Sequence, residues 1–129
     1  PTQNRTSVND QYLAGLFDGE GCVTYSNKTA LRKGRRKAYA YWVITLEVSM
    51  THEETIKTIH QMFDCGTVRP RHRAALHHLP QWRWRCGYRD ALHCARRLVP
   101  YSITKKQKLE SIIKHYEIKD RKILGYAKP

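Results

Sequence analysis

The sequence predicts a single α+β domain with the element order α-β-β-α-β-β-α-α, in which an antiparallel four-stranded sheet carries its helices on one face. Two observations predict this fold class. Apolar and polar residues alternate over residues 39–49, which is typical of a strand with one buried face. In three other segments the apolar residues recur at helical spacing. The chain has 129 residues, the size of one domain, and we assign residues 1–118 to that domain and 119–129 to a C-terminal tail.

The first half of the chain begins with a predicted helix. Ser7 and Asp10 have the spacing of a capping box, and Gly19 and Gly21 end the helix, because glycine adopts the left-handed conformation at low cost. A strand over about residues 22–26 follows. After it come a basic connection over residues 28–37 and the strand over residues 39–49, whose expected core face is Trp42, Ile44, Leu46 and Val48.

The second half contains a helix, two strands and two helices, over about residues 51–63, 67–73, 81–86, 89–98 and 104–118. Thr51 and Glu54 form a second capping box at the start of the first of these helices. Pro100 separates the last two helices. All three tryptophans are expected in the core, because Trp42, Trp82 and Trp84 share faces with apolar neighbours.

The charge of the chain points to a polyanionic partner. Lys and Arg number 24 against 11 Asp and Glu, a net charge of +13, and nucleic acid is the first candidate for such a protein. No apolar run approaches the roughly 18–20 residues that cross a bilayer. The polar N-terminus does not resemble a secretion signal, so we expect a cytoplasmic or organellar location at DNA.

The four cysteines, at positions 22, 65, 86 and 94, contain no C-x-x-C pair. A zinc finger or ribbon is therefore not supported. We expect them to be reduced residues that fill gaps in the core. The less favoured alternative is a zinc site built from Cys86, His93 and Cys94 with the pair His77 and His78.

Polar and basic side chains gather on the sheet face that the helices leave bare. On the predicted strands these are Thr24, Ser26, Lys28, Tyr41, Thr45, Glu47, Arg69, Arg71, Arg73, Gln81, Arg83 and Arg85, and the basic connection adds Arg32, Lys33, Arg35, Arg36 and Lys37. A two-stranded ribbon fits the DNA major groove, where arginine pairs bidentately with guanine. The alternative is the solvated face of a basic protein.

The segment YLAGLFDGEG, residues 12–21, has two unusual properties. Gly15 and Gly19 share one helical face, and a mid-helix glycine costs roughly 1 kcal/mol relative to alanine, which suggests close approach of a second copy of this helix. Asp18 and Glu20 lie at the helix C-terminus, where carboxylates are disfavoured by roughly 0.3–1 kcal/mol. A bound divalent cation removes that conflict. The alternative is a helix-ending turn with a solvated glutamate.

The string LAGLFDGEG, residues 13–21, resembles the signature of the LAGLIDADG homing endonucleases, from which it differs at Phe17, Gly19 and Glu20. The element order resembles the αββαββα core and saddle-shaped sheet of that family over nearly the whole chain. A single motif in a short chain resembles the homodimeric branch.

The resemblance implies roles for particular residues. Glu20 matches the acid that binds metal at the scissile phosphates, with the carbonyl of Gly19 as a further ligand. Lys105, or else Lys106, matches the basic residue that polarises the site. The implied dimer contacts are Ala14, Gly15, Asp18 and Gly19. The implied cofactor is Mg²⁺, with Mn²⁺ able to substitute and Ca²⁺ supporting binding without cleavage.

One position departs from the family pattern. Met50 occupies the end of the second strand, where the family often has a glutamine that holds a water near the metal, and a thioether is only a weak acceptor. Ser49 and His52 remain as candidate substitutes.

The resemblance thus implies a homodimer that makes a double-strand break in a near-palindromic DNA site of roughly 20 base pairs, encoded within an intron or another mobile element. The Met50 departure favours a different function, that of a protein of the same fold that binds nucleic acid without cutting, as an RNA maturase or a regulator. A general basic nucleic-acid-binding module also fits the charge of the chain. A structural protein without a nucleic-acid partner is less compatible with the Arg-rich face.

Overall fold

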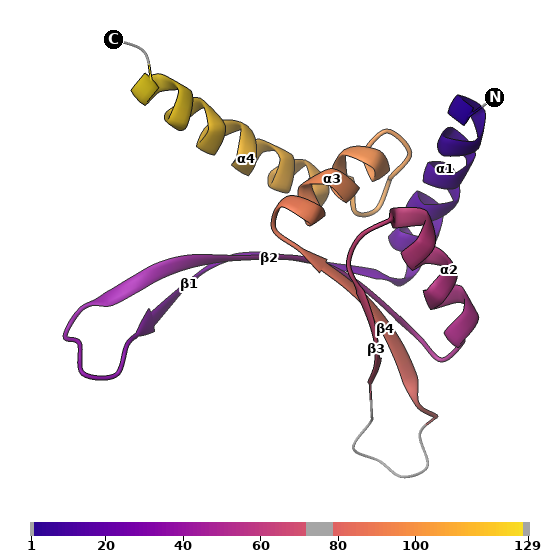
Figure 1. Ribbon diagram of the computed structural model, residues 1–129, viewed down its shortest axis with the longest axis horizontal. Helices are drawn as coiled ribbons and strands as arrows, with labels where there is room; N and C mark the ends of the chain where they lie inside the picture. The colour runs from indigo at the N-terminus through magenta and orange to yellow at the C-terminus, as the bar shows by residue number, and fades with distance from the viewer. Residues whose placement is uncertain (1, 72–78, 128–129) are drawn as a thin grey trace.

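The computed structural model describes the backbone of residues 2–71 and 79–127, and the side chains of residues 8–71 and 79–123. Its element order is the predicted one (Figure 1). The elements are α1 (Thr2–Glu20), β1 (Gly21–Leu31), β2 (Ala38–Met50), α2 (Glu53–Phe63), β3 (Thr67–Arg71), β4 (Gln81–Gly87), α3 (Arg89–Leu98) and α4 (Lys106–Ala127). No helix in the described part of the chain is long and apolar enough to cross a membrane.

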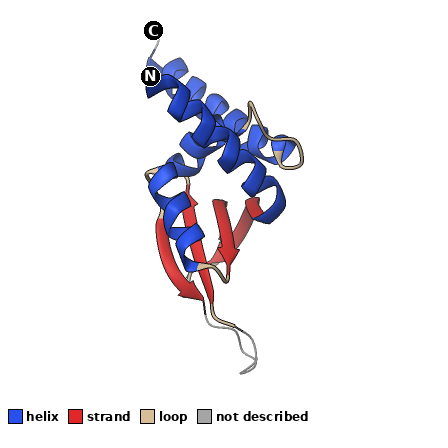
Figure 2. Cartoon of the chain, turned by 90° about the vertical axis from the view of Figure 1, so that its right-hand side faces the viewer, coloured by secondary structure: helices blue, strands red, loops and turns tan. Residues whose placement is uncertain are grey.

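The four strands form one antiparallel sheet in the order β1-β2-β4-β3. All four helices lie on one side of it, which confirms the predicted α+β architecture (Figure 2). β1 and β2 pair from Gly21 opposite Val48 to Leu31 opposite Ala38. The hairpin that they form extends well beyond the helices (Figure 1). At its tip the Arg35 amide donates to the Arg32 carbonyl, and Gly34 takes the left-handed conformation that this turn needs.

The core lies between the sheet and the helices. Ile44, Leu46 and Val48 of β2 are fully buried, as their alternation predicted. Trp84 is also fully buried and stacks on Phe63 of α2, with 4.2 Å between ring centroids. These contacts confirm Trp84 as a core residue.

The prediction for Trp42 was wrong. This side chain is 37% exposed and stacks on Tyr25 beyond the end of the core. The two rings form part of a cavity of about 610 Å³ between the hairpin and α4, together with Ser111, Lys114, His115, Ile118, Lys119 and Lys122. Trp42 faces the helix side as expected, but α4 does not close over it. Trp82 is only partly buried and lies near the Lys57 ammonium group.

Both predicted capping boxes were wrong. α1 begins at Thr2, so Ser7 lies inside the helix and Asp10 pairs with Arg97 of α3 instead of capping. α2 begins at Glu53, and its cap is His52, whose Nδ1 accepts from the Thr55 amide. An imidazole nitrogen provides the same acceptor as the expected threonine hydroxyl, one residue later.

Two predicted boundaries also moved. β1 continues to Leu31 because every residue from Gly21 onward has a partner in β2, although the polar stretch after Ser26 carries no strand pattern. α4 continues to Ala127, so residues 119–127, assigned to a tail, extend the last helix. Arg89 of α3 holds part of this extension through a bidentate pair with Asp120.

Arg97 joins three helices. Its guanidinium donates to Asp10 of α1 and to the carbonyls of Met62 and Phe63 at the end of α2. We expect Arg97→Lys to lower the free energy of unfolding by about 2 kcal/mol, because lysine keeps the charge but cannot make the forked set of bonds. Urea denaturation measures this. Arg96→Lys, at an exposed neighbouring position, is the control, and an equal loss in both variants would contradict the prediction.

Candidate nucleic-acid interface

The end of α1 presents the acid of the signature segment. Glu20 is the last residue of α1 and Gly21 the first of β1, so the helix enters the sheet without a loop. A Cβ atom at Gly21 would collide with the Phe17 ring, which explains why glycine follows the acid. Glu20 is exposed, and no described side chain pairs with its carboxylate. The carboxylate is therefore available for a ligand.

Asp18 binds the segment that leads into α4. Its carboxylate accepts hydrogen bonds from the Ser102 hydroxyl and from the amides of Ile103, Thr104 and Lys105. Burial raises the pKa of Asp18, but these four bonds together lower it below its usual value. The Asp18 carboxylate, for which the resemblance implied a dimer contact, is thus also bound within its own chain.

The hydrogen bonds to Asp18 bring the Lys105 backbone close to the end of α1. The Lys105 amide lies 3.2 Å from Asp18 Oδ1. Asp18 precedes Glu20 by two residues in the sequence. Lys105 is half-buried and lies one residue before α4, not inside it as expected, whereas Lys106 is the exposed first residue of the helix. The fold thus gathers Gly19, Glu20 and Lys105 in one region.

Met50 and His52, at the end of β2 and just after it, are engaged in other contacts, whereas the Ser49 hydroxyl is not. Met50 pairs with Trp82 across the sheet and packs against the core. His52 Nδ1 caps α2, so this nitrogen does not replace the missing glutamine. The Ser49 hydroxyl is buried without a hydrogen-bond partner among the described residues. Of the two suggested substitutes, Ser49 keeps a free hydroxyl and His52 keeps its Nε2, which has no partner among the described residues.

The exposed side of α1 carries the two glycines. Around Gly15 and Gly19 a Cβ atom would meet nothing within 4 Å. Two large apolar side chains, Val8 and Tyr12, are 61% and 50% exposed on the same helix. Ala14 was expected on this side, but it is fully buried in the core of its own chain. The accessible side of α1 therefore carries apolar side chains and has no side chain at its two glycines. Another helix can approach such a surface closely.

The strand register places the polar and basic strand residues predicted to contact DNA bases on the sheet face away from the helices. Arg85 lies between Glu47 and Thr67, and Arg83 lies between Ser49 and Arg69. Further cross-strand pairs on this face include Thr24 with Thr45, Lys28 with Tyr41, Ser26 with Val43 and Arg71 with Gln81.

Two of the residues predicted to contact DNA bases differ from expectation. Thr45 is only 9% exposed, so it offers little surface to a ligand. Glu47 Oε1 lies 3.3 Å from Arg83 Nη1, so these two side chains already neutralise each other. Arg73 lies outside the described residues.

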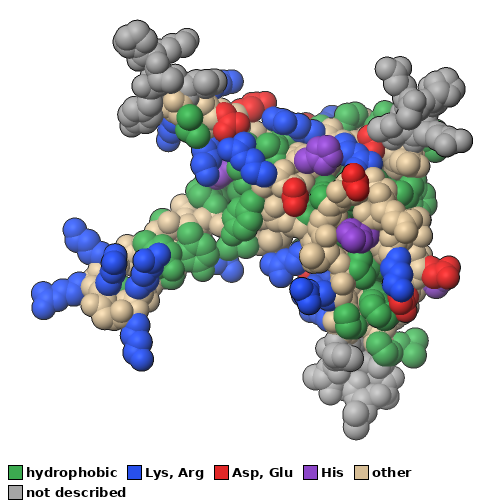
Figure 3. All heavy atoms as spheres, in the orientation of Figure 1, with side chains coloured by type: hydrophobic (Ala, Val, Ile, Leu, Met, Phe, Trp, Pro, Cys, Tyr) green, Lys and Arg blue, Asp and Glu red, His purple; other side chains and the backbone are tan. Residues whose placement is uncertain are grey.

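The tip of the β1–β2 hairpin is strongly basic. Arg32, Lys33, Arg35, Arg36 and Lys37 are all exposed. Figure 3 shows Lys and Arg side chains spread around this end of the molecule, away from the acidic groups. The Arg32 guanidinium lies over the Tyr39 ring at 5.1 Å, which orients one of these charges.

Sequence reasoning missed Ser102 as a contributor to this site. It is buried and donates to Asp18 across 84 residues. The local signal was present, because a serine just before a predicted helix is a typical capping residue. The partner of that serine was not visible without the fold.

Comparisons with known proteins identify the fold. No family model matches the sequence, and no curated protein is similar to it. Among solved structures, the homing endonuclease I-CvuI in complex with the I-CreI target has a TM-score of 0.68 and 19% identity, over 85% of this chain and 66% of that chain. The archaeal intron-encoded homing endonuclease I-Vdi141I complexed with DNA has a TM-score of 0.61 and 14% identity, over 81% and 64%.

A third structure, the I-LtrWI LAGLIDADG homing endonuclease bound to target DNA, has a TM-score of 0.61 and 15% identity, over 88% of this chain and 37% of that chain. The chain thus spans about two thirds of the length of the first two proteins. Its fold is that of the LAGLIDADG homing endonucleases.

Proposed function

We propose that this protein is a site-specific DNA endonuclease that acts as a homodimer and makes a Mg²⁺-dependent double-strand break in a long, near-palindromic site, in the cytoplasm or an organelle. The observation that carries the proposal is the end of α1. There the signature segment leaves Glu20 exposed and without a described partner, beside a glycine face with open space around it.

The residues at this end of α1 fit a hard divalent cation. Glu20 offers a carboxylate and Gly19 a backbone carbonyl, and Mg²⁺ prefers oxygen ligands of this kind. Bound Mg²⁺ would act as a Lewis acid and lower the pKa of an attacking water. Lys105 would offset negative charge on the scissile phosphate. Asp18 acts indirectly, because it holds the Lys105 backbone in place.

Two surfaces would bind DNA in different ways. The basic hairpin tip supplies charge for phosphates, and the Arg-rich face of β3 and β4 supplies groups that read base edges. Arg85 is exposed on that face, whereas Arg83 is engaged with Glu47. We therefore assign the main base contact on β4 to Arg85.

We expect Arg85→Ala to weaken binding to the preferred site by about 1–3 kcal/mol and to relax base preference there. Arg36→Ala, at the hairpin tip, is the matched comparison. It should weaken binding to all sequences and reduce the slope of log K against log salt by about 0.9 per lost phosphate contact. Binding titrations at several salt concentrations separate the two effects. Identical behaviour of the variants would contradict the assignment.

A dimer would bury the exposed side of α1. We expect Gly15→Leu to stabilise the isolated chain by up to about 1 kcal/mol, because leucine is the better helix former, while the bulk prevents close helix approach and abolishes the dimer. Sedimentation measures association and urea denaturation measures stability. Gln61→Leu on the exposed side of α2 is the control. Undiminished association of the Gly15 variant would exclude this side of α1 as the interface.

The proposal is tested on a randomised duplex library, incubated with the protein in Mg²⁺ and separately in Ca²⁺, with sequencing of bound and cut DNA. Double-strand cuts in Mg²⁺ alone, centred in near-palindromic sites, are the expected result. Selective binding in both ions without cutting would overturn the nuclease and support a binding protein of the same fold. That second function is favoured by one observation, the packing of Met50 against the core.

A further inference from the structure

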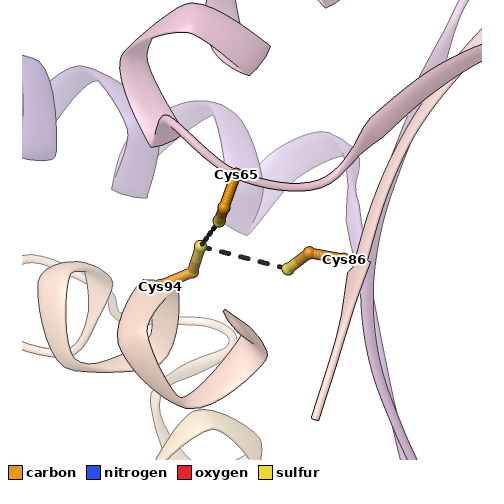
Figure 4. Close-up of side chains that lie close together, drawn as sticks. All are labelled: Cys65, Cys86 and Cys94. Carbon is orange, nitrogen blue, oxygen red and sulfur yellow. Dashed lines mark hydrogen bonds between the residues drawn. The ribbon is translucent and has the colours of Figure 1, made fainter. Parts of the chain in front are cut away.

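Three of the four cysteines meet at one point in the fold. Cys65 follows α2, Cys86 lies on β4 and Cys94 lies on α3, and their side chains point toward one another (Figure 4). The Sγ atom of Cys94 lies 3.3 Å from that of Cys65 and 3.9 Å from that of Cys86. All three sulfur atoms lie within 4.8 Å of one another. The cluster is separate from the end of α1 and plays no part in the proposed cleavage.

The backbone holds Cys65 in this position. Asp64 and Gly66 on either side of it both have positive φ, 58° and 88°. The Cys65 carbonyl accepts from Trp84 Nε1 at 2.9 Å, and His60 Nε2 lies 3.0 Å from the Gly66 carbonyl. A Cβ atom at Gly66 would come within 2.7 Å of the Arg85 carbonyl, so no other residue fits without movement. The loop is therefore fixed tightly against β4, with the Cys65 thiol turned inward.

From this juxtaposition we propose that Cys65, Cys86 and Cys94 form a three-thiolate site for a thiophilic divalent metal ion of the Zn²⁺ class. In a tetrahedral site, Zn–S bonds of about 2.3 Å place sulfur atoms about 3.8 Å apart. The two shorter separations in the cluster lie on either side of that value. Thiolates are soft ligands that select such metals over Mg²⁺ or Ca²⁺. The cations of the cleavage reaction therefore do not compete for this site.

The fourth coordination position is open on the side of Cys65. No fourth His, Cys, Asp or Glu joins the cluster within the described residues. Cys86 and Cys94 are buried, whereas Cys65 is partly exposed. The exposed side of Cys65 is a path for the ion to enter. A water molecule or an external thiol completes the tetrahedron there.

Binding must release protons, because the free thiols are neutral. Burial raises the pKa of Cys65. Hydrogen bonding to Cys86, together with burial, raises the pKa of Cys94. One divalent ion replaces three thiol protons and forms three metal–sulfur bonds, leaving a complex of net charge −1. Affinity is therefore expected to increase with pH.

The test uses Cd²⁺ and Zn²⁺ as probes with the full chain, reduced and freed of metal. We expect one Cd²⁺ per chain, detected by the ultraviolet sulfur-to-cadmium charge-transfer band. Zn²⁺ should displace it, raise the melting temperature and bind more tightly as the pH rises. Cys22→Ser is the control, because this exposed cysteine lies outside the cluster and its loss should change none of these results.

Two variants test the ligands. Cys65→Ser, at a partly exposed position, and Cys94→Ala, which removes a buried ligand, should each lower Cd²⁺ affinity by more than the roughly 10–100-fold that a supporting residue contributes. Circular dichroism without metal checks that each variant is folded. The site is overturned if the wild-type chain shows no thiolate band, or if the band persists in a folded Cys65 or Cys94 variant. Neither result depends on whether the protein cuts DNA.

Discussion

Replacing Glu20 by glutamine is expected to lower DNA cleavage about a thousandfold while leaving DNA binding unchanged. Lewis-acid stabilisation by a bound metal is worth several kcal/mol, and each 1.36 kcal/mol corresponds to a tenfold change in rate. Glutamine keeps the size of the side chain but removes the charge that would hold the cation. Because Glu20 is exposed and has no described partner, the substitution should not affect folding.

Single-turnover cleavage of a selected site in Mg²⁺ measures this effect, and binding of the same site in Ca²⁺ shows that recognition is intact. Glu117→Gln, at an exposed position on α4, removes the same charge away from the site and should cleave at the wild-type rate. If Glu20→Gln cleaves normally with intact binding, Glu20 is not the metal ligand.

The second large effect is expected at Asp18. We expect Asp18→Ala to lower the free energy of unfolding by about 3 kcal/mol at neutral pH, because a hydroxyl and three amides lose a charged acceptor at the entrance to α4. The same change frees the Lys105 backbone, so cleavage should also decrease.

The pH dependence of stability identifies the carboxylate. Because the folded-state pKa of Asp18 lies below its usual value, its contribution is fully present above about pH 3.9 and is lost as the pH falls through the lowered pKa. The difference in stability between wild type and Asp18→Ala should therefore shrink in strong acid. Urea denaturation at several pH values measures it. Asp120→Ala, which breaks an exposed pair with Arg89, should have little effect, and a pH-independent difference for Asp18 would contradict this account.

The sequence predicted the type and order of every element because each has a clear pattern of its own. Ile44, Leu46 and Val48 alternate with polar residues, and Ile56, Ile59 and Phe63 recur at helical spacing, and all six are buried as this requires. The position of Glu20 at the end of α1 followed from the glycines around it. Local sequence was sufficient in these cases, because the spacing of apolar residues and the end of a helix are both set by residues that are close together in the chain.

The contacts that the sequence did not reveal join distant parts of the chain. Asp18 binds residues 84–87 positions away, and Asp10 pairs with Arg97. Locally, Asp10 was interpreted as part of a cap, and Asp18 as a cation ligand or part of a helix-ending turn. The contacts that both acids make depend on how α3 and the segment before α4 lie against α1, and no single segment contains that information.

The cysteine cluster shows the same limit. Cys65, Cys86 and Cys94 are separated by 21 and 8 residues, which matches no common metal-binding spacing. Three different elements bring them together, and the left-handed residues Asp64 and Gly66 direct the first of them inward. A search for short motifs does not find a site of this kind.

The projection of the β1–β2 hairpin has an evolutionary consequence. Residues 31–38 are all exposed, so substitutions there, other than at the left-handed Gly34, remove no core contact and should change stability by only about 0.5 kcal/mol or less. Selection can therefore change the basic residues at the hairpin tip while the remainder of the fold stays constant. If the tip binds phosphates as proposed, a lineage carrying this protein can adjust the strength of DNA binding through single mutations there, without compensating changes in the core.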